Sequence, residues 1–401
     1  MKKTGMMKPI FLRAVLLLAA LLAAQTPSRA LATSQTSTGD PVALQEPTGP
    51  YAVGQTLLDW TDTTREEPGT DEPDDLRQIP VQIWYPAPAG ATGERAPYRP
   101  RAEAFRPVWG DESVDFFNSV QTSWIKDVAA NPDGPFPVFV FSHGWSARSS
   151  SHGTFLSNVA SHGYIVVGIN HPYLGRVALA SGQVTEPSDE QFADQQSANK
   201  FYAEDVMFVL DKITELNRDD PDGRLTGTVD LGRVGAGGHS SGFPAVSGAA
   251  VTDKRIRALI SFDAGVPRIV RREGLDVPIL LFRGATDSYT DLFFRGEDIH
   301  PKGTIYDVDF FRVHRGDFYD IVISGTTHTS VYDEYLFAET DAEREQSTRN
   351  HITFAAYAVA FLDQVLTEQD APLLRETAED NPQTTLRVIP ALQRPSEALG
   401  H

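Results

Sequence analysis

The sequence predicts an α/β fold: a mostly parallel central sheet with helices on both faces and lid-like insertions. Short, nearly uninterrupted apolar runs recur along the chain, as is typical of strands buried on both faces. Segments with helical spacing of apolar residues lie between these runs, and strands that alternate with helices form parallel sheets. A length of 401 residues with 41% hydrophobic residues is enough for one large domain of this kind.

Seven segments have the composition of strands. They are residues 81–85 (VQIWY), 137–142 (PVFVFS), 164–170 (YIVVGIN), 233–237 (RVGAG), 256–262 (IRALISF), 278–282 (PILLF) and 319–323 (YDIVI). Helical spacing predicts helices over residues 149–161, 198–216, 242–252 and 351–366. Two stretches, 86–135 and 288–316, interrupt the alternation, and such insertions often form lids or binding loops.

Both ends of the chain differ in composition from the predicted catalytic domain at residues 51–370. Residues 1–32 combine a positive start, an apolar run and an Ala-Leu-Ala sequence, which predicts a signal peptide cut after Ala32. The protein is therefore expected to be secreted or periplasmic. Residues 33–50 predict a flexible linker, and residues 371–401 predict a loose C-terminal tail.

Charge and composition exclude several classes of function. The formal net charge is −19, and it becomes −24 once the five basic residues of the signal peptide are removed. Such a surface repels nucleic acid and is not drawn to anionic membranes. The lack of cysteine excludes a cysteine nucleophile and thiolate metal sites. No metal-ligand motif is present, so we expect no metal and no cofactor; the oligomeric state stays open.

Residues 238–242 (GHSSG) carry the motif G-x-S-x-G between a predicted strand and a predicted helix. In the α/β-hydrolase fold, a serine in this motif lies at a sharp turn, where larger neighbouring residues would clash. Only Ser240 has glycine at both required positions, so Ser240 is the predicted nucleophile. The nearby GAGG at 235–238 lacks the spacing of a dinucleotide-binding loop.

A serine nucleophile needs a general base, and the base needs an acid that orients it. His328 lies in a polar loop after the last predicted strand, where this fold places its catalytic histidine. Asp263 and Asp287 each follow a predicted strand between the serine and the histidine. Spacing does not decide between these two acids, because either strand end can reach the histidine.

The tetrahedral intermediate of ester hydrolysis needs two N–H groups directed at its oxyanion. The backbone of Ser241, directly after the nucleophile, is expected to supply one. The loop after residues 137–142 begins His143-Gly144-Trp145. There Gly144 permits a tight backbone, and Trp145 is expected to supply the second N–H group.

Several of these segments resemble the platelet-activating factor acetylhydrolase family, which includes lipoprotein-associated phospholipase A2. The resemblance is carried by residues 141–172 (FSHGWSARSSSHGTFLSNVASHGYIVVGINHP) and by GGHSSGFP at 237–244. GPYAVGQTLLDWTD, IPVQIWYPA, SFDAG and TTHTS add to it, so that it extends from about Gly49 to Leu366.

The resemblance implies a triad of Ser240, Asp263 and His328, with oxyanion donors at Trp145 and Ser241. It implies a lipid ester substrate with a short or oxidised sn-2 acyl group on a phospholipid, hydrolysed without calcium. Two features depart from the family pattern: the elbow is HSSGF rather than HSFGG, and a second candidate acid is present after the next strand. A general short-chain carboxylesterase, or a dienelactone or polyester hydrolase, is therefore the alternative. A non-catalytic binding protein of the same fold is the alternative from another class.

Phe116, Val120 and Trp124 are spaced four residues apart in the first insertion. This spacing predicts an amphipathic helix that either packs on the domain or, as the resemblance suggests, makes transient contact with a lipid surface. The sequences on both sides are acidic, unlike those of basic interfacial helices.

Overall fold

The computed structural model describes residues 42–391, except residues 73, 286–307 and 378. The predicted signal peptide and the candidate acid Asp287 therefore lie outside the described residues. No helix in the described ranges is long and apolar enough to cross a membrane.

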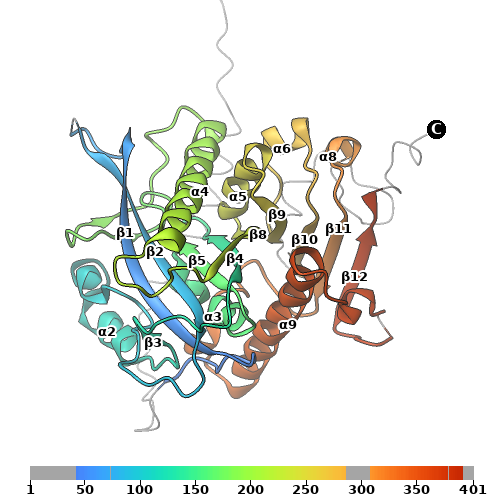
Figure 1. The fold of residues 1–401 in the computed structure, drawn as a ribbon, viewed down its shortest axis with the longest axis horizontal. Coiled ribbons are helices and arrows are strands. Elements are labelled where there is room, and N and C mark those ends of the chain that lie inside the picture. Colours follow the sequence, from blue (N-terminus) through green and yellow to red (C-terminus); the bar gives the residue numbers. More distant parts are fainter. Residues whose placement is uncertain (1–41, 73, 286–307, 378, 392–401) are drawn as a thin grey trace, which may run out of the picture. The chain divides into compact units, whose positions relative to one another are not determined.

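The described residues form a ten-stranded sheet in the order β12-β11-β10-β9-β8-β4-β5-β2-β1-β3 (Figure 1). The six strands from β5 to β11 are parallel. Strand β12 is antiparallel to β11, β2 is antiparallel to β5 and β1 is antiparallel to β2, while the short β3 at the far edge is parallel to β1. The strands are β1 Ala52–Glu66, β2 Leu76–Ala87, β3 Ile125–Lys126, β4 Phe136–Ser142, β5 Ile165–Ile169, β8 Val229–His239, β9 Ile256–Phe262, β10 Ile279–Gly284, β11 Phe318–Ile323 and β12 Thr384–Ile389. A separate small hairpin consists of β6 Val177–Ala178 and β7 Val184–Thr185.

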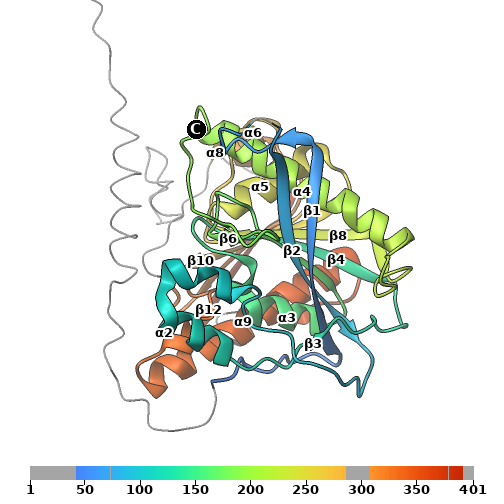
Figure 2. The same ribbon diagram turned by 90° about the vertical axis from the view of Figure 1, so that its left-hand side faces the viewer.

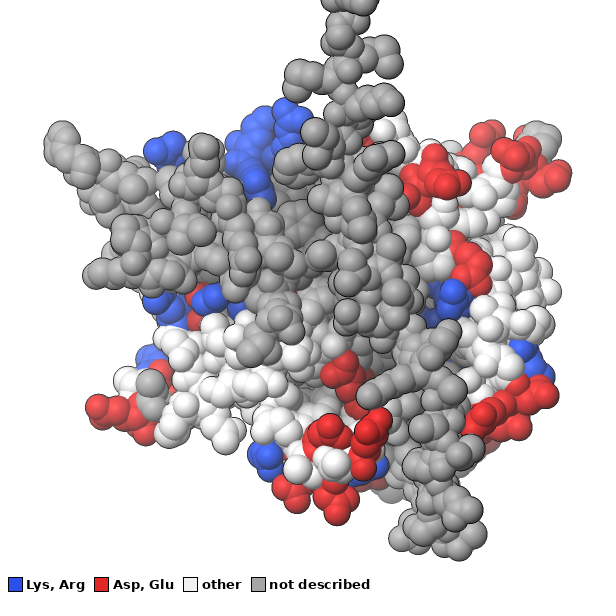
Figure 3. Space-filling model, turned by 180° about the vertical axis from the view of Figure 1, so that it is seen from behind, with Lys and Arg blue, Asp and Glu red and all other residues white. Residues whose placement is uncertain are grey.

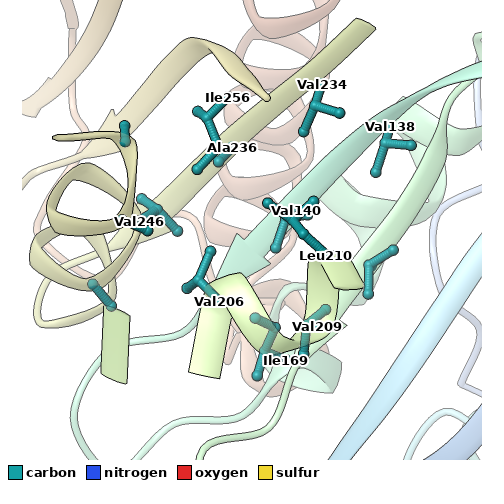
Figure 4. Close-up of a cluster of buried hydrophobic side chains, with 14 of the residues drawn as sticks. Val138, Val140, Ile169, Val206, Val209, Leu210, Val234, Ala236, Val246 and Ile256 are labelled. Carbon is teal, nitrogen blue, oxygen red and sulfur yellow. The ribbon is translucent and has the colours of Figure 1, made fainter. Parts of the chain in front are cut away.

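Helices cover both faces of this sheet (Figure 2). One face carries α4 Gln195–Arg218, α5 Gly242–Thr252, α6 Arg268–Glu273 and α8 Val308–Val313, and the other carries α3 Gly153–Ser161 and α9 Asp341–Leu366. Figure 4 shows part of the hydrophobic core on the α4 face of the sheet, where valines of α4 meet those of β4 and β8. Short 3-10 helices are η1 Ala102–Phe105, η2 Ser149–His152, η3 Glu334–Phe337 and η4 Pro372–Arg375, and α2 Arg106–Ser119 lies in the first insertion.

All seven predicted strands and all four predicted helices are present. Strand β9 and helix α5 have the predicted bounds, because these mostly apolar segments end directly before Asp263 and Asp253. Helix α9 begins at Asp341, ten residues before the prediction. Its first turns are polar and exposed, and a capping box between Thr340 and Glu343 starts the helix instead.

Two predictions about the chain ends were wrong for the described residues. In the predicted linker, the N–H of Leu44 donates to the carbonyl of Gln121 at 2.9 Å, and the Leu44 side chain is buried. In the predicted loose tail, β12 pairs with β11 and forms the edge of the sheet. A polar strand at a sheet edge buries only one row of side chains, so its hydrophobic pattern is weak.

The predicted amphipathic helix is also different in the structure. Helix α2 ends at Ser119 and is kinked at Gly110, so only Phe116 of the predicted stripe is helical. Val120 and Trp124 follow in extended backbone, and both are buried in the hydrophobic core on the α3 and α9 face of the sheet. Phe116 is partly buried against the same core, so all three apolar residues pack on the domain.

A buried charged network ties β2 to α4 beneath the carboxyl ends of β4 and β5. The guanidinium of Arg77 donates to Asp205 at 2.6 Å and to Glu67 at 2.7 Å. His171 Nδ1 donates to the same Asp205 carboxylate at 2.8 Å, and His171 Nε2 lies 2.8 Å from the hydroxyl of Ser142. Burial alone would raise the pKa of Asp205, but the charge of Arg77 and the bonds from His171 outweigh burial and lower it.

We expect Asp205→Asn to lower the free energy of unfolding by about 3–5 kcal/mol, because it leaves the charge of Arg77 buried with too little compensation. Urea denaturation at pH 7 measures this difference. Asp211→Asn, on the exposed side of the same helix, is the control. An Asp205 variant as stable as the control would contradict the importance of the network.

Candidate active site

Ser240 lies at a tight turn between β8 and α5. Its φ angle is +50°, a left-handed conformation that is strained for a residue with a side chain. Its N–H donates to the carbonyl of Phe262 at 3.1 Å, which fixes the turn to β9. A Cβ atom at Gly238 would lie 2.4 Å from the carbonyl carbon of Gly242, and one at Gly242 would lie 2.1 Å from the carbonyl oxygen of Ser142. The turn therefore requires glycine at both positions, as the sequence predicts.

Asp263 and His328 are brought together at the carboxyl ends of the next strands. The N–H of Asp263 donates to the carbonyl of Phe282 at 2.7 Å, and its Oδ1 accepts from the N–H of Gly284 at 3.2 Å. Its Oδ2 lies 2.7 Å from His328 Nδ1. This bond puts the proton on Nδ1 and leaves Nε2 as the ring nitrogen that can exchange a proton with a nucleophile. Sequence reasoning left two acids open, and this contact favours Asp263.

His239, directly before the nucleophile, connects the turn to the histidine loop. Its Nε2 donates to the carbonyl of His328 at 2.8 Å, and the two imidazole rings lie 4.7 Å apart. Burial, followed by the nearby charge of His328, lowers the pKa of His239 to about 3. His239 therefore stays neutral and donates at any pH where an esterase works. The sequence analysis did not assign it a role, because a hydrogen bond to a backbone atom leaves no sequence signal.

The loop after β4 passes directly beside the nucleophile. A Cβ atom at Gly144 would lie 3.1 Å from the Cβ of Ser240 and 2.9 Å from Nδ1 of His239, so only glycine fits. The carbonyl of Gly144 accepts from Nδ1 of His143 at 2.8 Å and from the N–H of Ala147 at 3.1 Å. Because a trans peptide holds its C=O and N–H in opposite directions, these bonds also set the direction of the Trp145 N–H.

His143 is itself held in one tautomer. Its Nε2 accepts from the N–H of His171 at 3.1 Å, so the ring proton is on Nδ1, where it donates to the Gly144 carbonyl. Burial, followed by the charge of His171, lowers the pKa of His143 well below its usual value. The buried network through Asp205 thus ends at the peptide that carries the predicted oxyanion donor. Ser241, the other predicted donor, is the N-cap residue of α5, where backbone N–H groups have no partner within the helix.

Within the described part of the chain, no group of three or more His, Asp or Glu side chains could hold a metal ion. A pocket of about 540 Å³ near the end of β1 is lined by Glu66, Asp71 and Phe201, among others, and includes no residue of the predicted triad. We assign the site from the geometry around Ser240, because a pocket without a nucleophile and a base cannot carry out ester hydrolysis.

We expect His143→Phe to reduce kcat by roughly 10- to 100-fold with a small change in KM, because an oxyanion donor contributes to the transition state alone. The ring volume is nearly kept, but the bond to the Gly144 carbonyl is lost. Steady-state kinetics with p-nitrophenyl acetate measure the effect, and His162→Phe, at the surface end of α3, is the control. A rise in KM with unchanged kcat would contradict an oxyanion role.

Comparison with known proteins finds similarity to esterases. Residues 40–218 match the model of platelet-activating factor acetylhydrolase, isoform II. The chain is 25% identical over 244 residues to a probable 1-alkyl-2-acetylglycerophosphocholine esterase from Arthroderma benhamiae. That match covers 56% of this chain and 59% of the relative's length, so it spans little more than half of that protein.

Among solved structures, the chain is similar to a ferulic acid esterase from Streptomyces cinnamoneus, with a TM-score of 0.69 and 22% identity. The likeness covers 86% of this chain and 99% of that one, and at this identity it shows the fold alone. The predicted α/β-hydrolase fold is thereby confirmed, and the comparisons support the predicted class of carboxylic ester hydrolase. Through residues 40–218, the chain is a relative of the platelet-activating factor acetylhydrolase, isoform II, family.

Proposed function

We propose that the protein is a serine esterase that hydrolyses short or oxidised sn-2 acyl esters of phospholipids. The observation that carries this proposal is the Asp263–His328 hydrogen bond of 2.7 Å beside the strained turn at Ser240. The substrate class rests on the family match and on the name of the Arthroderma relative.

In the proposed reaction, the hydroxyl oxygen of Ser240 attacks the ester carbonyl carbon while His328 Nε2 accepts the hydroxyl proton. Asp263 stabilises the imidazolium and keeps the ring in place. The N–H groups of Trp145 and Ser241 stabilise the oxyanion. The intermediate then breaks its bond to the alcohol, which takes the proton from His328, and an acyl group remains on the serine. Water, activated by the same histidine, releases the acid.

Exposed apolar side chains support contact with a lipid surface. Val108 on α2 is 47% exposed, Trp145 on the oxyanion loop 40%, and Phe337 in η3 56%. The ring of Phe337 lies 5.3 Å from that of Phe116, so the α2 insertion is in contact with the segment that follows His328. Figure 3 shows acidic side chains along the lower edge of one face of the molecule.

A general short-chain carboxylesterase is the second candidate. It is favoured by the HSSGF sequence around Ser240, which departs from the family pattern. It is also favoured by the similarity in fold to a solved structure of a ferulic acid esterase. We also propose that the chain is exported, on the strength of the signal sequence at residues 1–32.

We expect the purified protein, in EDTA, to release acetate from an sn-2-acetyl phospholipid and from p-nitrophenyl acetate. Ser240→Ala is expected to lose at least about 10⁴-fold of kcat, because the nucleophile is removed. Turnover of only the nitrophenyl ester would favour the general carboxylesterase. No turnover of either ester would contradict both functions and favour a binding protein.

We expect Asp263→Asn to lower kcat by about 10⁴-fold, because an amide no longer stabilises the correct tautomer of His328. Asp287→Asn is the matched comparison and is expected to keep most of the activity. Steady-state kinetics on both variants decide between the two candidate acids, and the opposite pattern would assign the role to Asp287.

A further inference from the structure

Two arginines lie against the aromatic side chains of the α2 insertion with no ion pair to another described residue. Arg99 is 6% exposed, and its Nε has no hydrogen-bond partner in the described part of the chain. Its guanidinium lies 3.8 Å from the ring centre of Phe117 and 5.1 Å from that of Trp109. The guanidinium of Arg148 lies 4.6 Å from the same Trp109 ring, and its Nε donates to the carbonyl of Arg176 at 3.2 Å.

The charges around this pair, which we call the Arg99–Arg148 pair, do not balance. Burial, followed by the charges of Arg99 and Arg176, lowers the pKa of Arg148. The acid that acts on Arg99 is Asp333, whose oxygens accept from the N–H groups at the start of α3 and whose pKa is raised by burial to about 7. Arg99 is buried and Arg148 is partly buried. Buried guanidinium groups are normally paired with anions, so this arrangement lacks a full negative partner.

Two neighbouring arginines, in contrast, have acidic partners. Arg101 is paired with Asp59, and Arg176 is paired with Glu186 at 2.6 Å. The chain as a whole has 54 acidic and 35 basic residues, so acids were available for such pairing. The missing partner is therefore a feature of this position and not of the composition.

The pair also lies close to the catalytic groups. Arg148 follows the oxyanion donor Trp145 by three residues on the same loop. The ring of Tyr332 lies 4.9 Å from that of His239 and 4.8 Å from that of His152, and Nδ1 of His152 donates to the carbonyl of Arg148 at 3.2 Å. A pocket of about 30 Å³ is lined by Arg148, Phe105 and Ser150 among others, but not by Arg99, and has room for about two water molecules.

We propose that the Arg99–Arg148 pair forms a subsite for an anionic group of the ester substrate, a carboxylate or a phosphate. Guanidinium groups bind both through paired N–H donors, and the surrounding rings shield them from water and strengthen the interaction. The anion has two possible sources, the far end of an oxidised acyl chain or the phosphate of the alcohol part. This inference rests on the proposed esterase function and adds a charge requirement to its substrate.

The test compares kcat/KM within two matched pairs of esters. The first pair is mono-p-nitrophenyl glutarate and p-nitrophenyl valerate, which differ by a terminal carboxylate. The second is 1-alkyl-2-acetylglycerophosphocholine and 1-alkyl-2-acetylglycerol, which differ by the phosphocholine group. In Arg148→Gln and Arg99→Gln, the ratio of anionic to neutral ester is expected to fall about tenfold or more in at least one pair.

Two further variants separate charge from structure. Arg106→Gln removes the same charge from the exposed side of α2, where Arg106 contacts Glu103 and Asp115, and it should leave both ratios unchanged. Arg148→Lys keeps the charge and should retain part of the preference. A change in the kcat/KM ratio of the glutarate pair alone shows that the bound anion is the carboxylate of the acyl chain. A change in the ratio of the phospholipid pair alone shows that it is the phosphate of the alcohol part. Ratios unchanged in both Arg99→Gln and Arg148→Gln, or lowered equally by Arg106→Gln, would overturn the proposal.

Anion binding is also measured without turnover. Glutarate or inorganic phosphate should raise the Tm of the wild type and of Ser240→Ala but not that of Arg148→Gln. If the wild type hydrolyses no ester, the proposed function fails while this measurement still decides the subsite. If esters are hydrolysed but neither anion raises Tm and neither ratio changes, the function stands and the subsite is refuted.

Discussion

The close contact between the turn at Ser240 and the end of β4 is the constraint on which the rest of the site depends. A Cβ at Gly242 would lie 2.1 Å from the carbonyl oxygen of Ser142, so the start of α5 rests directly on the strand that leads into the oxyanion loop. The nucleophile and the oxyanion donor are thereby brought together by backbone packing. A side chain at Gly242 would separate them.

The other two residues of the proposed triad reach this point because neighbouring parallel strands end at the same edge of the sheet. Asp263 directly follows strand β9, and the loop after β11 carries His328. Two hydrogen bonds close the arrangement, one from His328 to Asp263 and one from His239 to the backbone of His328. The buried network through Asp205, His171 and His143 then reaches the oxyanion loop from the opposite side, so stability and catalysis share the same side chains.

Much of this arrangement could be predicted from the sequence. Apolar runs such as residues 256–262 show where the central strands lie, and G-x-S-x-G identifies Ser240 through a steric requirement that leaves a clear pattern. The edge strands β1 and β12 could not be predicted in the same way, because strands covered on one side have weaker patterns. The roles of His143 and His239 were also missed, since their partners are backbone atoms distant in sequence. The Arg99–Arg148 pair is recognised only once the insertion is seen to pack against the oxyanion loop.

Mass spectrometry of the protein after reaction with a fluorophosphonate tests whether Ser240 is the nucleophile. We expect one adduct per chain on the peptide that contains Ser240, with fragment ions that place it on Ser240 and not on the adjacent Ser241. We expect no adduct in Ser240→Ala. An adduct on Ser241, or a folded protein that remains unlabelled, would contradict the assignment of the nucleophile.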